Sequence, residues 1–274
     1  MTIEILPVTP TIGAEIRGVD LAKPLSREAV DAIRDALHAH LVLFFRDQRL
    51  GEADHIAFAR HFGEIQVPPI KTKYHENPEI NVLDQVSPRG DGADNWHADH
   101  TYTSRPALGS ILRAVKVPRF GGDTAFASMY AAYDALSEPM RRMLDGLTAV
   151  HDITRSATRG IRAGHVTQSL GEIQRRLPPV RHPVIRTHPV TKRKLVFVNA
   201  NSTTRIRELP DAESEAVLRF LFEHVRTPEF QVRFRWDEES LVFLDNRCTQ
   251  HYAVPDYDER RILHRVTIAG DVPY

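Results

Sequence analysis

The sequence has a single cysteine, no long apolar run and no excess of charge of either sign. The lone Cys248 excludes an internal disulfide framework and suits a reducing compartment, so we expect a cytoplasmic protein. The longest apolar run, Leu41 to Phe45, is far too short to span a bilayer. The first residues lack the basic and apolar regions of a signal peptide, so none is expected.

The charges balance, with 36 Lys and Arg against 36 Asp and Glu. Such a chain has no overall field that would attract nucleic acid or a membrane surface, and we expect neither as a partner. Sequence repeats and glycine-rich phosphate-binding loops are also missing. The length allows one large domain, and we expect residues 1–274 to form it.

Strand patterns dominate the second half of the chain. Val232 to Trp236 alternates, Leu241 to Leu244 is an apolar run that ends at Asp245, and Ile262 to Ile268 alternates again. Helical patterns are inserted before and between the strands, at 26–37, 53–62, 131–147 and 211–225. Because strands and helices do not alternate regularly, we expect a mainly β fold with helical insertions, an antiparallel barrel or jelly roll.

The segment from Thr154 to Lys194 differs from the rest in charge. It contains ten Lys or Arg and one acidic residue, Glu172, so its net charge is +9. Glycines and a Pro178-Pro179 pair interrupt it. We expect a long excursion from the barrel, with three interpretations open: a lid that attracts an anionic substrate, a subunit contact, or a solvated surface.

Three residues could hold a metal ion. Residues i and i+2 of a strand point to the same side, so His97 and Asp99 could chelate one ion from one short strand. His251 is the candidate for a third ligand. Two His and one carboxylate on one face of an octahedral ion are typical of non-haem Fe(II) oxygenases. A surface strand with a His and an Asp, a zinc-dependent hydrolase and a non-enzymatic metal-binding barrel remain alternatives.

Two arginines follow on an expected strand. Arg261 and Arg265 are four residues apart, so they share a face at a spacing of about 13 Å. A strand that lines a metal site could use them to hold two separate anions.

Several motifs together resemble the taurine and aryloxyalkanoate dioxygenases (TauD/TfdA). They are Thr11 to Leu21, Trp96 to Asp99, Gly121 to Thr124, Asp245 to Arg247, Thr249 to Tyr252 and Arg260 to Arg265. The resemblance implies a double-stranded β-helix (jelly roll, cupin-like) and an Fe(II) enzyme that converts 2-oxoglutarate and O₂ to succinate and CO₂ while hydroxylating a substrate. It further implies His97, Asp99 and His251 as iron ligands. Thr124 and Arg261 would hold the distal carboxylate of 2-oxoglutarate.

The resemblance also bears on the substrate. It implies that Arg265 faces an anionic head group, with Lys71 and His100 as helpers. Pro68, Ala93 and His100 stand where the taurine enzymes carry other residues, which argues against taurine. We therefore expect a small anionic substrate of the alkyl sulfate, sulfonate or aryloxyalkanoate type, and a homo-oligomer.

The remaining reactive side chains are expected to be structural. Cys248 is interpreted as a small buried residue rather than a nucleophile. His264 alternates away from the two arginines, so no role is assigned to it. Other histidines lack ligand spacing and are expected to be surface or capping groups: His55, His61, His151 and His188.

Overall fold

The computed structural model describes residues 3–70, 77–86, 94–164 and 166–274. Within them the fold is mainly β with helical parts, as the sequence predicts. The largest sheet has seven strands in the order β1-β2-β3-β13-β5-β15-β4, antiparallel except between β2 and β3. They are β1 (Glu4–Pro7), β2 (Ala14–Arg17), β3 (Val42–Phe45), β13 (Leu241–Asp245), β5 (Gly109–Lys116), β15 (Arg261–Ile268) and β4 (Asn81–Gln85).

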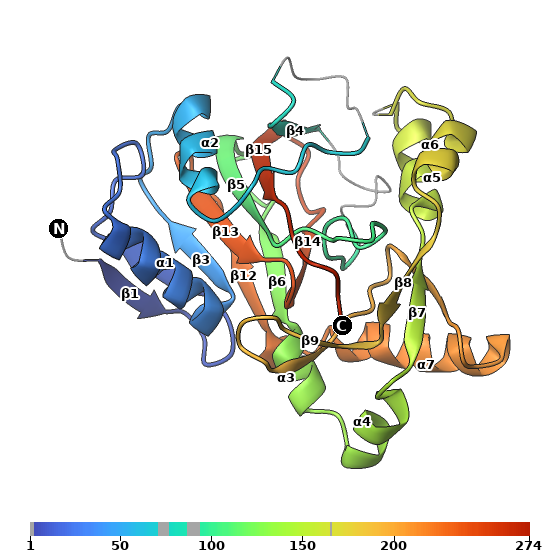
Figure 1. Cartoon of the computed structure of the whole chain (residues 1–274). Coiled ribbons are helices and arrows are strands. Elements are labelled where there is room, and N and C mark those ends of the chain that lie inside the picture. Colours follow the sequence, from blue (N-terminus) through green and yellow to red (C-terminus); the bar gives the residue numbers. More distant parts are fainter. Residues whose placement is uncertain (1–2, 71–76, 87–93, 165) are drawn as a thin grey trace.

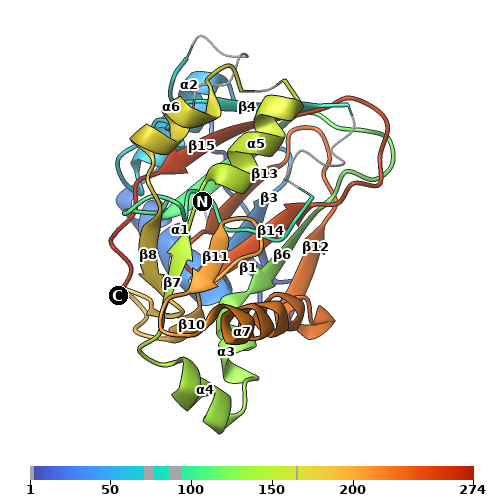
Figure 2. The ribbon, with the colours of Figure 1, turned by 90° about the vertical axis from the view of Figure 1, so that its right-hand side faces the viewer.

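A smaller antiparallel sheet faces the large one. Its order is β12-β6-β14, formed by β12 (Gln231–Phe234), β6 (Thr124–Ser128) and β14 (Thr249–Ala253). Side chains of both sheets share one core cluster, in which Phe44 stacks on Phe234 at 4.5 Å between ring centroids. Figure 2 shows the three strands β14, β6 and β12 of the small sheet side by side. Polar side chains of the two sheets also meet, since Arg261 Nη2 on β15 donates to Thr124 Oγ1 on β6 at 3.1 Å.

Helices cover the outer face of the large sheet. They are α1 (Arg27–His40) and α2 (Glu52–Arg60), and their buried side chains share a second core cluster with Leu43, Phe45 and Phe243. The alternation of Val42 and Phe44 toward one cluster, and Leu43 and Phe45 toward the other, follows from the strand period of two. Ser26 caps α1, because its hydroxyl accepts from the Ala29 N–H at 3.3 Å.

Further helices flank the small sheet. The helical pattern at 131–147 is divided in the structure, as α3 (Met129–Asp134) and α4 (Glu138–Leu144) are separate helices. The helical pattern at 211–225 is present as α7 (Asp211–His224), which buries Leu218 and Leu221, with Pro210 at its N-cap. A short 3-10 helix (Pro228–Phe230) leads into β12. Among the described residues, no helix combines the length and apolarity needed to cross a membrane.

The predicted excursion contains regular structure. Its elements and their neighbours are β7 (Thr148–His151), α5 (Thr154–Arg162), α6 (Leu170–Arg176), β8 (Val180–Pro183), β9 (Ile185–Thr187), β10 (Lys194–Val196) and β11 (Thr203–Ile206). They form two further sheets, β11-β7-β8 and β10-β9. Figures 1 and 2 both place α5 and α6 at the same end of the molecule as β4. Their small core includes Ile153 and Ile173, and Tyr102 packs against it.

Candidate metal centre

Three predicted ligands meet between the sheets. His97, Asp99 and His251 each offer a ligand atom, and these atoms lie within 4.8 Å of one another. The His97 Nε2 and the Asp99 Oδ1 are 3.9 Å apart, and the two imidazole centroids are 4.3 Å apart. Asp99 and His251 are buried, and His97 is half-buried. The three groups are close enough to bind one cation together.

The local geometry differs from the prediction that His97 and Asp99 lie on a strand. His97 forms only an isolated β-bridge with His251, through N–H to O distances of 3.0 and 2.8 Å, and Asp99 already lies in a turn. The strand prediction was therefore wrong for this segment, because its only ladder contact among the described residues is one bridge to a distant strand. The two side chains nevertheless converge.

The protonation states suit a divalent metal. Burial lowers the pKa of His251 to about 3, with the nearby His97 acting in the same direction, so this imidazole is neutral. Burial alone would raise the pKa of Asp99, but the charge of the adjacent Arg265 guanidinium outweighs it and holds the pKa well below its usual range. The Asn95 carbonyl accepts from the His97 Nδ1–H at 2.8 Å, which leaves Nε2 for a ligand. Neutral imidazoles and an ionised carboxylate are the forms that bind metal.

Thr124 and Arg261 lie next to each other, as the resemblance implies. Arg261 Nη2 donates to Thr124 Oγ1 at 3.1 Å, and Trp236 Nε1 donates to the same oxygen at 3.0 Å. Since a hydroxyl has two lone pairs and one proton, Thr124 keeps its own O–H for another acceptor. Gly122, at φ +70°, makes this approach possible, because a Cβ there would lie 3.2 Å from Arg261 Cδ.

The predicted substrate-binding residues fall in different places. Arg265 Nη1 donates to Asp99 Oδ1 at 2.6 Å, so it reaches the proposed metal ligands. His100 is buried, and its Nδ1 lies 3.2 Å from Gln66 Oε1. Burial, with Arg265 nearby, lowers the pKa of His100 to about 4, so it brings no positive charge to the site. Pro68 is half-buried, whereas Lys71 and Ala93 lie outside the described residues.

Two buried polar residues hold Asp99, and no role was predicted for either. Ser110 on β5 donates to Asp99 Oδ2 at 2.8 Å. Asn246 accepts from the Asp99 N–H at 2.6 Å and donates to the Asp99 carbonyl at 2.9 Å. The role of Asn246 could have been predicted, because Asn246 lies in the motif Asp245 to Arg247. Nothing in the sequence around Ser110 indicates a role for that residue.

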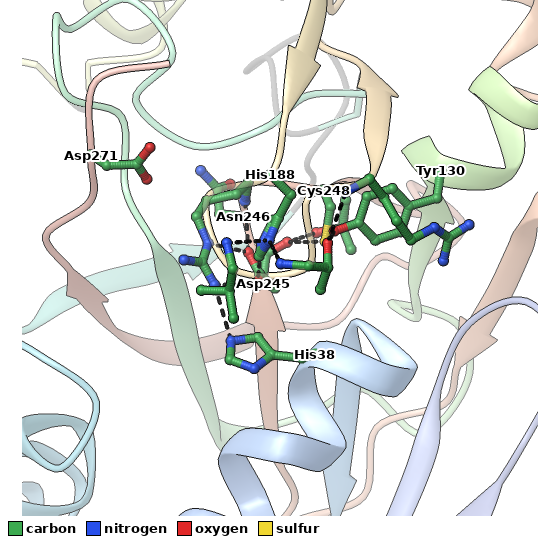
Figure 3. A network of polar contacts seen from close by, with 12 residues as sticks. His38, Tyr130, His188, Asp245, Asn246, Cys248 and Asp271 are labelled. Atoms are coloured by element: carbon green, nitrogen blue, oxygen red, sulfur yellow. Dashed lines mark hydrogen bonds and ion pairs between the residues drawn. The ribbon is translucent and has the colours of Figure 1, made fainter. Parts of the chain in front are cut away.

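A second cluster of ligand-type side chains lies nearby (Figure 3). His188, Asp245 and Cys248 are all buried there. The His188 Nδ1 accepts from two backbone N–H groups, of Val190 and Thr191, so its Nε2 carries the proton and donates to Asp245 at 3.2 Å. Both Asp245 oxygens accept from the guanidinium of Arg247. Because these donors and acceptors are already engaged, the cluster fits a structural network better than a metal site.

The predictions for the other side chains had mixed outcomes. Cys248 is buried as predicted, and burial raises the pKa of its thiol well above the usual value. His61 is exposed, and His188 is a capping group, since its Nδ1 accepts from the Val190 and Thr191 N–H groups; the prediction of surface positions was wrong for His55 and His151, which are buried. Their burial arises from packing between distant elements, as when His55 on α2 contacts the Ile111 carbonyl of β5 at 3.1 Å.

Known proteins resemble this chain over nearly its full length. A sulfate ester dioxygenase of Pseudomonas putida, described as alpha-ketoglutarate-dependent, is 36% identical over 100% of this chain and 91% of its own. An alpha-ketoglutarate-dependent 2,4-dichlorophenoxyacetate dioxygenase of Cupriavidus pinatubonensis is 35% identical over 99% of each chain. The crystal structure of AAD-2 in complex with Mn(II) and N-oxalylglycine superposes with a TM-score of 0.86 at 30% identity, covering 100% of this chain and 99% of that one.

The family model of the taurine catabolism dioxygenases matches residues 4–267. The relatives named above are oxidoreductases that depend on alpha-ketoglutarate, which is 2-oxoglutarate. These matches set aside the zinc-dependent hydrolase and the metal-binding barrel without activity. The chain therefore belongs to the TauD, TfdA family and is a 2-oxoglutarate-dependent dioxygenase.

Proposed function

We propose that His97, Asp99 and His251 bind Fe(II) and that the enzyme hydroxylates a small anionic organic substrate. The observation that carries the proposal is the convergence of two imidazoles and one ionised carboxylate in a buried site. Such a set leaves three coordination positions open on one side of an octahedral ion. When bound, iron would supply the activation of O₂ that couples oxidation of 2-oxoglutarate, to succinate and CO₂, with insertion of one oxygen atom into the substrate.

We assign the distal carboxylate of 2-oxoglutarate to Thr124 and Arg261. The Thr124 hydroxyl receives two N–H donors, so its own proton is available to a carboxylate beside the guanidinium. N-oxalylglycine, which the structurally similar AAD-2 binds with Mn(II), carries the same oxo-acid and distal carboxylate groups as 2-oxoglutarate.

We assign the anionic head of the substrate to Arg265. The guanidinium already contacts one carboxylate, Asp99, and lies on the same strand face as Arg261. His100 would contribute a hydrogen bond rather than a charge, because its imidazole is neutral. The named substrates of the relatives, a sulfate ester and 2,4-dichlorophenoxyacetate, are anions with an ether or ester oxygen. Hydroxylation of the carbon next to that oxygen gives a product that collapses to a carbonyl compound and releases sulfate or a phenol.

The surroundings of the site are part of the same proposal. The two facing sheets would correspond to a double-stranded β-helix within one domain, and α5 and α6 would cover the substrate entrance. Tyr102 and Ile70 support this placement of the helices, since both pack against the small core that α5 and α6 form.

We also propose that the enzyme is a cytoplasmic homo-oligomer. It would use neither nucleic acid nor a membrane as a partner, because its charges balance.

The test is a comparison of substrate classes with the purified enzyme, Fe(II), 2-oxoglutarate and O₂. Alkyl sulfates, aryloxyacetates, amine-free sulfonates and taurine are compared by succinate formation and by release of sulfate, phenol or sulfite. We expect an anion without an ammonium group to give the highest coupled turnover. If taurine is the best substrate, the assignment of the head-group pocket is refuted. If none of these compounds supports succinate formation, the proposed substrate class is refuted.

A further inference from the structure

The two oxygens of the Asp99 carboxylate have different neighbours. Oδ1 lies 3.9 Å from the His97 Nε2 and accepts from Arg265 Nη1 at 2.6 Å. Oδ2 accepts from the Ser110 hydroxyl at 2.8 Å. Ser110 is fully buried, so no solvent competes for this bond. Oδ1 therefore faces the proposed ligand His97, while Oδ2 is hydrogen-bonded to Ser110 of β5.

The backbone of Asp99 is held by a second side chain. Asn246 accepts from the Asp99 N–H at 2.6 Å and donates to the carbonyls of Asp99 and Ala107 at 2.9 and 3.1 Å. This pattern fixes the orientation of the amide, since the oxygen meets a donor and the nitrogen meets two acceptors. Asn246 is also buried, and its own N–H donates to the Leu108 carbonyl.

Asp99 needs such support because no sheet holds it. His97 has a single β-bridge, Asp99 lies in a turn, and His100 has a left-handed φ of +56°, which a residue with a side chain adopts at a cost. Asn246 precedes β14, the strand that carries His251. Its two hydrogen bonds with the Asp99 backbone therefore join the two segments that carry the proposed ligands, and the third ties them to Ala107 before β5.

The turn that carries Asn246 is itself rigid. Its neighbour Asp245 is buried and accepts from Arg247 Nε at 2.9 Å and Nη2 at 2.6 Å, and His188 donates to it as well. Figure 3 shows Asp245, Asn246 and His188 together in this network. The network thus gives Asn246 a fixed base from which to position Asp99.

We propose that Ser110 and Asn246 are positioning residues that set how Asp99 binds the metal. Asn246 fixes the Asp99 segment relative to His251. Ser110 occupies Oδ2, which leaves Oδ1 as the oxygen that would bind the metal. This inference rests on the proposed function of His97, Asp99 and His251 as metal ligands.

The chain offers a matched control for Ser110. Thr267 on β15 pairs directly with Ser110 in the sheet, and it is equally buried. Unlike Ser110, its hydroxyl has no hydrogen-bond partner within the described residues. Thr267→Val therefore removes a hydroxyl from the same place without touching Asp99.

The experiment measures the dissociation constant of Mn(II) by titration calorimetry, together with the Tm of the metal-free protein. We expect Ser110→Ala to weaken Mn(II) binding by about tenfold to a hundredfold, the usual effect of losing a hydrogen bond to a metal ligand. Thr267→Val should bind Mn(II) like the wild type. Wild-type affinity in Ser110→Ala, or equal weakening in both variants, would overturn the role of Ser110.

Two further variants separate the possible failures. Asn246→Asp keeps the shape of the side chain and the acceptor for the Asp99 N–H, but it loses the two N–H donors to the Asp99 and Ala107 carbonyls. This variant tests the proposal if Ser110→Ala does not fold. We expect a similar loss of Mn(II) affinity, and wild-type affinity would overturn the role of Asn246. Asp99→Ala tests the metal site itself. If it binds Mn(II) normally, the proposed function fails, whereas weakening confined to Asp99→Ala refutes only the positioning roles.

Discussion

Arg265 and Asp99 form an ion pair between Nη1 and Oδ1 over 2.6 Å, although they lie 166 residues apart in the chain. Only 12% of the Arg265 side chain and 5% of the Asp99 side chain are exposed. The proposed anchor of the substrate thus touches a proposed metal ligand. A bound metal ion and an anionic substrate would therefore both interact with this ion pair. Loss of Arg265 or of Asp99 should then affect both the metal site and the substrate site.

Asp99→Ala should abolish turnover and Mn(II) binding, because one of three proposed ligands is lost. It should also lower the free energy of unfolding of the metal-free protein by about 3–5 kcal/mol, since Arg265 is left buried without its counter-ion. Urea denaturation measures this loss. The double variant Asp99→Ala with Arg265→Met should recover most of it, and full activity of Asp99→Ala would remove Asp99 from the site.

Arg261→Ala should raise the KM for 2-oxoglutarate by about tenfold or more, because a charge-assisted hydrogen bond contributes roughly 1.5–3 kcal/mol. Steady-state kinetics with varied 2-oxoglutarate check this. Arg260→Ala is the matched control, since Arg260 is exposed and pairs with Asp84 on the surface. An unchanged KM in Arg261→Ala would transfer the role to Arg265.

Stability should fall in acid because of buried neutral imidazoles. Burial lowers the pKa of His55 to about 3, whereas an unfolded chain has an ordinary histidine pKa near 6.5. Between these values the unfolded state binds the extra proton, so the contribution of His55 to stability is complete above about pH 6.5 and is lost as the pH falls toward 3.

The size of this effect can be measured by urea denaturation of the metal-free protein at several pH values. His55→Gln should make the dependence shallower by about 1.4 kcal/mol per pH unit below pH 6. The exposed His61→Gln serves as the control. An identical slope in wild type and His55→Gln would show that the His55 imidazole is protonated in the folded state.

Cys248 should not react with a maleimide while the protein is folded. Its thiol is buried, and burial raises its pKa well above the usual value, so the reactive thiolate is scarce. Labelling followed by mass spectrometry should proceed at the rate of unfolding and become fast in urea. Rapid labelling of the native protein would contradict a purely structural role.

Elements whose own side chains define a face were predictable from the sequence. Ser26 and the apolar residues of α1, the apolar run of β13 and the alternation of β15 are local patterns, and each gave the observed element. The helix α6 was missed although Ser169 and Glu172 form a capping box there, a signal that the sequence does contain.

The site was predictable where a motif names its residues, and less so where geometry depends on distant partners. His97, Asp99 and His251 converge as predicted, but not through a strand, because His251 supplies the only bridge. Ser110 looks like any other small residue of a buried strand. Its contact with Asp99 arises only when β5 and the segment after Trp96 are brought together, and no local pattern encodes that.

The position of β15 between β5 and β4 has a consequence for the order of folding. This strand carries Arg261 and Arg265 and follows both of its neighbours in the sequence, so on a ribosome β4 and β5 emerge long before it does. Until then β5 and β4 lack the partner that joins them, and both proposed anion anchors are missing. At roughly 5–20 residues per second, the roughly 145 residues from Lys116 to Arg261 take about 7–29 seconds to synthesise. The nascent chain therefore completes its reactive site only after β15 has emerged, when the helices described above have already been synthesised.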